Sequence, residues 1–172
     1  ALLEQLERLV PADQIDNDVL GDAIEVAAPE ELGAATTRVY RGRRGSRPVA
    51  AVLSPVVTQG YSGPIQLIVA VRADGTLSGV RVLGHRETPG LGDKIEIERS
   101  DWVLGFNGKS LLDPPASGWE VKRDGGEFDQ FTGATITPRA VVRGVRASLE
   151  YFTDHRAQLF GTEQSQGEKG ND

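Results

Sequence analysis

Residues 129–138 read Asp-Gln-Phe-Thr-Gly-Ala-Thr-Ile-Thr-Pro, and they lead directly into the longest helical pattern of the chain. Thr137 suits the N-cap position of a helix and Pro138 suits the first helical position. An apolar stripe at helical spacing follows, formed by Val141, Val145, Leu149 and Phe152. With Gly161 as the stop signal, the pattern predicts one long helix that packs its stripe against another apolar surface.

That apolar surface is predicted to be an antiparallel sheet. Ile65–Arg72 alternates as a strand does, and Asp74-Gly75 is a two-residue hairpin signal that joins it to a second strand at Leu77–Leu83. Two further strands are expected upstream, at residues 36–40 and 49–57. We expect the 65–72 strand to be buried on one face and only partly buried on the other. Strands in this order, with helices packed on them, predict an α+β fold.

The remaining segments carry weaker patterns. Residues 12–34 are acidic with no sustained period, and residues 101–106 predict a short helix. Residues 117–122 and 127–131 are expected to be strand edges around a glycine turn. The turn at 41–47 is rich in arginine. We expect a solvated hairpin tip there, with contact to anionic lipid headgroups as the alternative.

The composition excludes several classes of site. The 172 residues are 38% hydrophobic and 26% charged, which is ordinary for a globular domain, and the net charge of −6 disfavours nucleic-acid binding. The absence of cysteine excludes disulfides, thiolate iron–sulfur clusters and c-type haem attachment. Only two histidines are present, which argues against a histidine-rich metal site. A redox function would therefore need an organic cofactor.

The start of the long helix has the features of an anion site. Helix N-termini present unpaired N–H groups and a partial positive charge, and phosphates bind there readily. Gly133 and Ala134 leave room for close approach to the backbone, and Thr132, Thr135 and Thr137 supply hydroxyls that hydrogen-bond a phosphate or become esterified to one. A capped helix after a tight turn, with no ligand, explains the same residues, so the pattern alone leaves both interpretations open.

A resemblance to a known family favours the first interpretation. Asp129 followed by Phe131-Thr132-Gly133-Ala134-Thr135 resembles the flavinylation motif of FMN-binding domains. Residues 85–94, His-Arg-Glu-Thr-Pro-Gly-Leu-Gly-Asp-Lys, resemble a loop of the G subunit of the Rnf ion-translocating electron-transport complex, as do residues 60–65 and 136–139. The C subunit of the sodium-pumping NADH:quinone reductase has a similar loop and motif. The resemblance runs from about Val49 to Phe152.

The resemblance implies a covalent flavin. In this family a flavin transferase moves FMN from FAD onto the last hydroxyl of the motif, which corresponds to Thr135, as a phosphoester. The domain would relay electrons between partner subunits of a Rnf-type complex that translocates ions, and would have no organic substrate of its own. The fold implied is the FMN-binding type, a mostly antiparallel sheet with packed helices.

The same resemblance implies a place in the cell and a division of the chain. It implies an N-terminal anchor in the bacterial cytoplasmic membrane, with the domain on the periplasmic side. The absence of methionine, even at position 1, predicts that the chain is not a complete reading frame. We expect a stalk and irregular segment at residues 1–34, the FMN-binding domain at residues 35–160 and a disordered tail at residues 161–172.

Candidate cofactor contacts follow from the two motifs. In addition to Thr135 they are Thr132, Gly133, Ala134, Ile136, Thr137, Glu87, Thr88, Leu91, Gly92, Tyr61 and Lys94. Tyr61 is a candidate to stack on the flavin ring and Leu91 to pack on it, while Lys94 would approach its phosphate or N1 region. For Glu87 the alternative is a surface carboxylate that caps the turn, for Lys94 a solvated side chain, and for Tyr61 simple turn packing.

The sequence leaves two other functions open. The first is a module that binds FMN or another phosphorylated ligand without a covalent bond, which the same helix N-terminus supports. The second is a structural subunit in which the motif is unused. A hydrolase is disfavoured because no nucleophile-elbow motif occurs.

Overall fold

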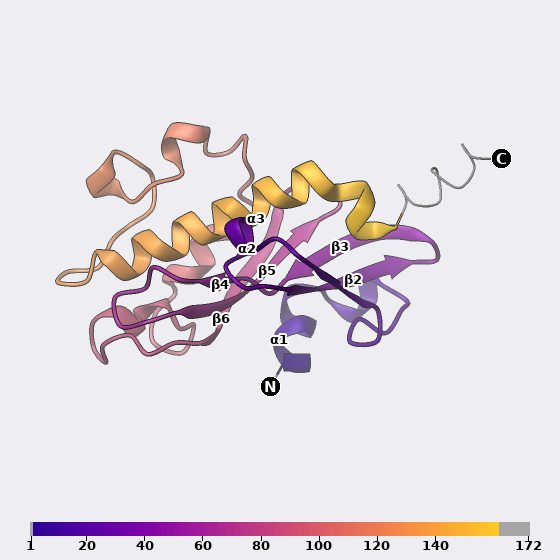
Figure 1. The fold of residues 1–172 in the computed structure, drawn as a ribbon, viewed down its shortest axis with the longest axis horizontal. Helices are drawn as coiled ribbons and strands as arrows, with labels where there is room; N and C mark the ends of the chain where they lie inside the picture. The colour runs from indigo at the N-terminus through magenta and orange to yellow at the C-terminus, as the bar shows by residue number, and fades with distance from the viewer. Residues whose placement is uncertain (1, 162–172) are drawn as a thin grey trace.

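The chain folds around a six-stranded antiparallel sheet with helices on both faces (Figure 1). The computed structural model describes residues 2–161. The strands run in the order β1-β2-β3-β5-β4, and β6 pairs with β5. The strands are β1 (Ala23–Val26), β2 (Thr37–Arg44), β3 (Arg47–Leu53), β4 (Val56–Val57), β5 (Ile65–Arg72) and β6 (Leu77–Gly84). The predicted α+β class is confirmed.

The helices differ greatly in length. The α-helices are α1 (Leu2–Leu9), α2 (Pro29–Leu32) and α3 (Ile136–Phe160). Short 3₁₀ helices lie in the connections: η1 (Ala12–Gln14), η2 (Gly92–Ile95), η3 (Trp102–Phe106), η4 (Ala116–Gly118) and η5 (Lys122–Asp124). Among the residues that the structure describes, no helix is both long enough and apolar enough to cross a bilayer.

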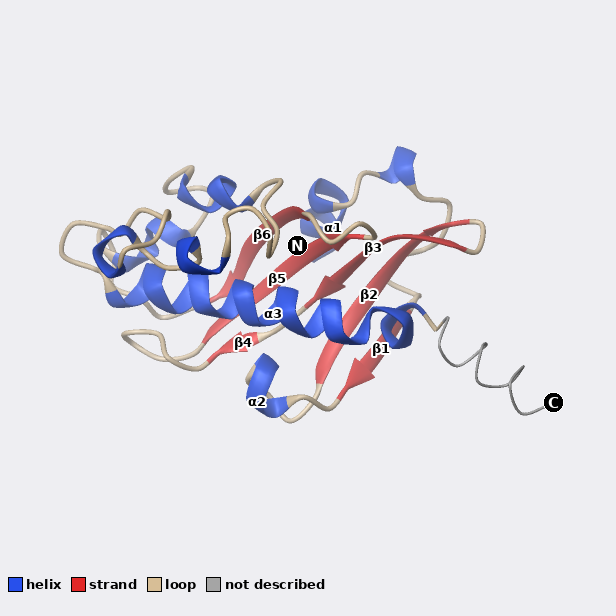
Figure 2. Ribbon diagram, turned by 90° about the horizontal axis from the view of Figure 1, so that it is seen from above, coloured by secondary structure: helices blue, strands red, loops and turns tan. Residues whose placement is uncertain are grey.

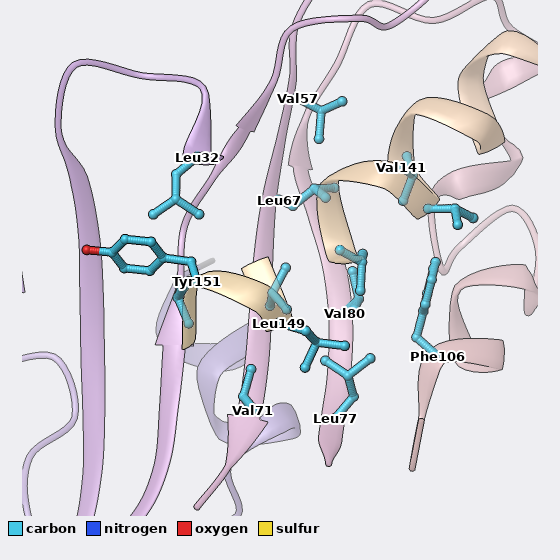
Figure 3. Close-up of a cluster of buried hydrophobic side chains, with 14 of the residues drawn as sticks. Leu32, Val57, Leu67, Val71, Leu77, Val80, Phe106, Val141, Leu149 and Tyr151 are labelled. Atoms are coloured by element: carbon cyan, nitrogen blue, oxygen red, sulfur yellow. The ribbon is translucent and has the colours of Figure 1, made fainter. Parts of the chain in front are cut away.

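Helix α3 lies across one face of the sheet (Figure 2). Its buried stripe includes the four residues predicted from helical spacing, Val141, Val145, Leu149 and Phe152. Figure 3 shows Val141 and Leu149 close to Leu67 and Val80 of the sheet. Gly161 ends the helix in the left-handed conformation, with φ of 80°, as predicted. The full burial of each large apolar side chain in the stripe of α3 stabilises the fold by about 1.5–3 kcal/mol.

The other face of the sheet is covered as well, which corrects the sequence expectation. In β5, Ile65, Leu67, Val69 and Val71 face α3, but Ile68 and Ala70 on the opposite face are equally inaccessible. Leu6 and Leu9 of α1, with Val10, pack on that second face. The strand pattern alone did not predict this, because it carries no information about a helix about 60 residues away in sequence.

Other expectations need correction as well: the strand predicted at residues 49–57 is divided into β3 and β4. The acidic segment 12–34 contains an edge strand, β1, and the short helix α2. Residues 117–122 and 127–131 form no strands; one isolated bridge, Val121 with Phe128, and a few backbone hydrogen bonds join them, beside η4 and η5. The stacked rings of Phe106, Trp119 and Phe128 pack this segment onto the core instead of a ladder of backbone hydrogen bonds.

The arginine-rich hairpin is tied to the end of α3. Arg41 and Arg43 bind the two oxygens of Asp22, with N–O distances of 2.6 and 3.0 Å. Their remaining donors reach the carbonyls of Leu159 and Phe160 at 3.1 and 2.9 Å. Cations belong at a helix C-terminus, where carbonyl groups lack partners. The expectation of a solvated hairpin tip is therefore wrong for Arg41 and Arg43, because these two arginines hold the end of α3 onto the sheet.

We predict that Asp22→Asn lowers the free energy of unfolding by about 1–3 kcal/mol at pH 7. Burial alone raises the pKa of Asp22, but the hydrogen bonds and charges of Arg41 and Arg43 outweigh it, so that the pKa lies below its ordinary value of 3.8. A depressed pKa stabilises the fold above the ordinary value, and this stabilisation is lost as pH falls below it. Urea unfolding of both proteins from pH 7 to pH 3 measures the difference, which should shrink below pH 4.

The control for this measurement is Asp18→Asn, because Asp18 is exposed and lies in the same turn. It changes the net charge equally and should leave stability within about 0.5 kcal/mol of wild type. An Asp22→Asn protein as stable as this control at pH 7 would contradict the proposed attachment of α3.

Candidate functional site

A buried carboxylate lies where three segments meet. Glu87 follows β6 in the loop of residues 85–91 and is only 3% exposed. Its Oε1 accepts hydrogen bonds from the Tyr61 N–H at 2.7 Å and the Thr137 hydroxyl at 2.6 Å, while Oε2 accepts the Ser62 N–H at 2.8 Å. Hydrogen bonds to an ionised acceptor are about twice as strong as neutral ones. Glu87 thus joins its own loop to the Tyr61 loop and to α3.

The loop that carries Glu87 is fixed by its own hydrogen bonds. The Glu87 N–H donates to Nδ1 of His85 at 2.9 Å, and His85 Nε2 lies 2.6 Å from Glu96. Because Nδ1 accepts, the proton of the neutral imidazole is on Nε2, where it meets the Glu96 carboxylate. Further along, the Gly90 N–H donates to Asp93 at 2.9 Å. These bonds position the loop without regular secondary structure.

The first turn of α3 differs from the sequence prediction. The helix begins at Ile136, and Thr135 occupies the N-cap position without a capping hydrogen bond from its side chain. Thr137 is not the cap, because its hydroxyl is directed to Glu87, and Pro138 is the third helical residue instead of the first. The first backbone bond of the helix runs from the Arg139 N–H to the Thr135 carbonyl. The N–H groups of Ile136 and Thr137 therefore have no partner within the helix.

A cavity of about 290 Å³ opens between these three segments. Three of its walls carry large apolar side chains that remain exposed: Tyr61 at 68%, Leu91 at 39% and Ile136 at 45%. Polar groups at the helix start complete the lining. The lining residues are Tyr61, Thr88, Leu91, Gly92, Gly133, Ala134, Thr135, Ile136 and Thr137. The cavity thus combines an apolar rim with the unpaired end of a helix.

Nine of the twelve predicted contact residues line this cavity. Of the other three, Glu87 lies beneath it with its oxygens on protein donors. Thr132 lines an adjoining cavity of about 560 Å³, which Thr135 and Gly133 also border. Lys94 lies in η2, partly buried, and lines neither cavity. The structure therefore brings the two motifs together and separates Lys94 from them.

Sequence reasoning missed several residues around the site. Ser62 supplies a backbone donor to Glu87, and Arg123 and Gln130 line the adjoining cavity. No local pattern singles out Ser62, because any residue supplies an N–H group. Arg123 had a weak signal, since it precedes the Asp124-Gly125-Gly126 turn that leads to the motif.

The charges around the helix start are balanced by a surface pair. Arg139 binds Asp124 through two nitrogens, at 2.7 and 3.0 Å. The hydrogen bond from Arg139 lowers the pKa of Asp124, and the charges of Arg143 and Arg123 lower it further. A basic residue in the first turn opposes the helix dipole. Asp124 offsets that cost for Arg139 without any ligand.

Comparison with known proteins shows which family this chain belongs to. The FMN-binding domain family matches residues 60–150, a range that includes the Tyr61 loop, the Glu87 loop and the start of α3. The G subunit of the ion-translocating oxidoreductase complex from Pseudomonas aeruginosa (strain UCBPP-PA14) is 50% identical over 168 residues, which cover 97% of this chain and 77% of that protein. The chain belongs to this family of G subunits.

Two further relatives carry the same description. The protein from Pseudoalteromonas atlantica is 49% identical over 160 residues, 92% of this chain and 74% of its own length. The protein from Cereibacter sphaeroides (strain ATCC 17029) is 52% identical over 158 residues, 92% of this chain and 70% of its own length. Each is named as the G subunit of an ion-translocating oxidoreductase complex.

The residues of this family member fit the chemistry of an FMN. Tyr61, Leu91 and Ile136 offer apolar surface for a flat aromatic ring at the rim of the cavity. The unpaired N–H groups of Ile136 and Thr137 are suited to a phosphate. Gly133, with φ of 76°, has only a Leu91 methyl group near its open side, at 3.5 Å from a hypothetical Cβ, so that a ligand can approach the backbone there.

We predict that Thr137→Val destabilises the flavin-free protein by about 1–3 kcal/mol, because the buried carboxylate loses one of its donors. Thr135→Val serves as the matched control, since the Thr135 side chain makes no capping hydrogen bond. It should change stability by no more than about 0.5 kcal/mol. Urea unfolding monitored by circular dichroism compares the two proteins. Equal unfolding midpoints would mean that the Thr137–Glu87 bond does not stabilise the fold.

Proposed function

We propose that the chain carries FMN as a phosphoester on Thr135 and serves as an electron carrier in an ion-translocating oxidoreductase complex. The observation that supports this most strongly is the position of Thr135, which borders both cavities at the uncapped start of α3. An anion joined to this residue lies next to the unpaired N–H groups of the first turn.

The environments of the three threonines favour Thr135 as the acceptor. Thr137 is 2% exposed, and its hydroxyl already donates to Glu87. Thr132 is exposed but lines only the adjoining cavity, not the one with apolar walls. Thr135 is partly exposed and lines both. Of the three threonines, Thr135 is the one that would allow an attached flavin ring to lie against Tyr61 with the phosphate at the helix start.

The attachment step we propose balances without any redox change. The Thr135 Oγ1 attacks the FMN phosphorus of FAD, and a Thr–O–P bond forms as the phosphoanhydride bond to AMP breaks. AMP leaves with the electron pair of that bond, and the hydroxyl proton is lost to a base of the flavin transferase. The chain itself contributes the hydroxyl and the anion-stabilising end of α3.

The role within a complex rests on the names of the relatives. They are named as subunits of an ion-translocating oxidoreductase complex, and therefore as parts of a multi-subunit assembly. FMN, when bound, accepts and releases electrons one at a time or in pairs. We place the domain on the periplasmic side of the bacterial inner membrane, held by an N-terminal anchor and in contact with other subunits. Covalent attachment suits this location, because no pool of free FMN is available there for rebinding.

Co-expression with a flavin transferase tests the attachment. We expect a fluorescent band on a denaturing gel under ultraviolet light, and an intact mass raised by one FMN less one water. Thr135→Val should remove both signals while the protein stays folded, because the acceptor oxygen is gone. Thr132→Val and Thr137→Val should keep the fluorescence.

The outcomes separate the proposal from its alternatives. Flavin that is released on unfolding would indicate non-covalent binding in the same cavity. A colourless protein of unmodified mass, obtained with an active transferase, would leave only a structural subunit. Fluorescence that persists in Thr135→Val would contradict the assignment of the acceptor.

A further inference from the structure

The Glu87 carboxylate is a buried charge without a paired cation. None of the ion pairs found among residues 2–161 includes it. Three dipoles surround it instead, the N–H groups of Tyr61 and Ser62 and the hydroxyl of Thr137. Both carboxylate oxygens thus have donors from the protein, and all three donors are uncharged. The site thus has a fixed negative charge directly beneath the cavity.

Two residues that line the cavity hydrogen-bond this carboxylate directly. Tyr61 and Thr137 both line the cavity and both bind Oε1 of Glu87. Gly92 packs onto the same pair of groups. A Cβ at Gly92 would lie 2.7 Å from the Thr137 hydroxyl oxygen and 2.9 Å from Cβ of Glu87, which is closer than real side chains approach. The three walls therefore share a single anchor, and the loop backbone at Gly92 has no room to move toward it.

We infer that Glu87 is a positioning residue that assembles the flavin cavity and that its charge lowers the reduction potential of the bound flavin. The inference rests on the proposed function. An electron added to the cofactor brings negative charge toward the carboxylate, and the repulsion disfavours the reduced form.

Glu87→Gln separates this role from simple packing. Glutamine has nearly the same shape, and its single carbonyl oxygen keeps acceptors for Tyr61 and Thr137, but its NH₂ group would face the Ser62 N–H. The fixed charge is lost while most of the packing stays. We expect the equilibrium constant for one-electron reduction of the flavin to rise about tenfold. This corresponds to a shift of the reduction potential to more positive values by ~59 mV.

The matched control is Glu98→Gln. Glu98 is exposed, lies eleven residues downstream and lines neither cavity of the site. The Glu98→Gln substitution removes the same formal charge and should leave the reduction potential of the flavin at the wild-type value. The measurement is a redox titration at pH 8, followed by flavin absorbance, of proteins that were flavinylated by co-expression. A Glu87→Gln protein with the wild-type potential would overturn the inference.

A second variant makes the test independent of how well Glu87→Gln folds. Thr137→Val keeps the carboxylate but removes one of its donors, so the charge is less neutralised and the potential should fall. Thr137→Ser keeps the hydroxyl and should restore the wild-type value. Shifts of the same sign in Glu87→Gln and Thr137→Val, or no shift in Thr137→Val, would overturn the inference.

Failure of the proposed function gives a different result. Each sample is first checked for a fluorescent band and for its intact mass. A wild-type protein without flavin would contradict the covalent attachment, and would leave the role of Glu87 in assembling the cavity to be tested separately. In that case the assembly role is tested in the flavin-free Thr135→Val background. There Glu87→Gln should lower the urea midpoint and Glu98→Gln should not. Equal midpoints would overturn the role of Glu87 in assembly.

Discussion

The hydrogen bonds to one buried carboxylate hold the site together. Glu87 joins two irregular loops to the start of α3, and its partners are 26, 25 and 50 residues away in sequence. A buried carboxylate that loses its donors costs far more than a neutral hydrogen bond contributes. The loops therefore have one favourable arrangement, and the cavity between them exists because of it.

Helix α3, which kinks at His155, holds that arrangement against the sheet. One end is fixed by the Thr137–Glu87 hydrogen bond, and the other by Arg41 and Arg43, which bind its last carbonyls. Between these ends the apolar stripe packs on strands whose opposite face is covered by α1. A site built on a rigid element is held more accurately than one on loops alone. The acceptor threonine lies at the beginning of this element.

The sequence predicted what depends on local pattern. Strands β5 and β6, the stripe of α3 and its glycine stop followed from periodicity and turn residues, and the two motifs led to most of the cavity lining. The errors came from partners distant in sequence. Thr137 was misassigned as a cap because a carboxylate 50 residues away binds its hydroxyl more strongly than a backbone N–H does. Arg41 and Arg43 were misassigned for the same reason, since Asp22 and the end of α3 are distant along the chain.

The proposed function depends on one oxygen atom, Oγ1 of Thr135, and peptide mapping tests it most directly. Trypsin releases residues 124–139, which contain Thr132, Thr135 and Thr137, as one peptide. After maturation with the transferase, fragment spectra of this peptide should assign the added mass of the flavin phosphate to Thr135. An unmodified peptide, or a modification on Thr132 or Thr137, would contradict the proposed attachment.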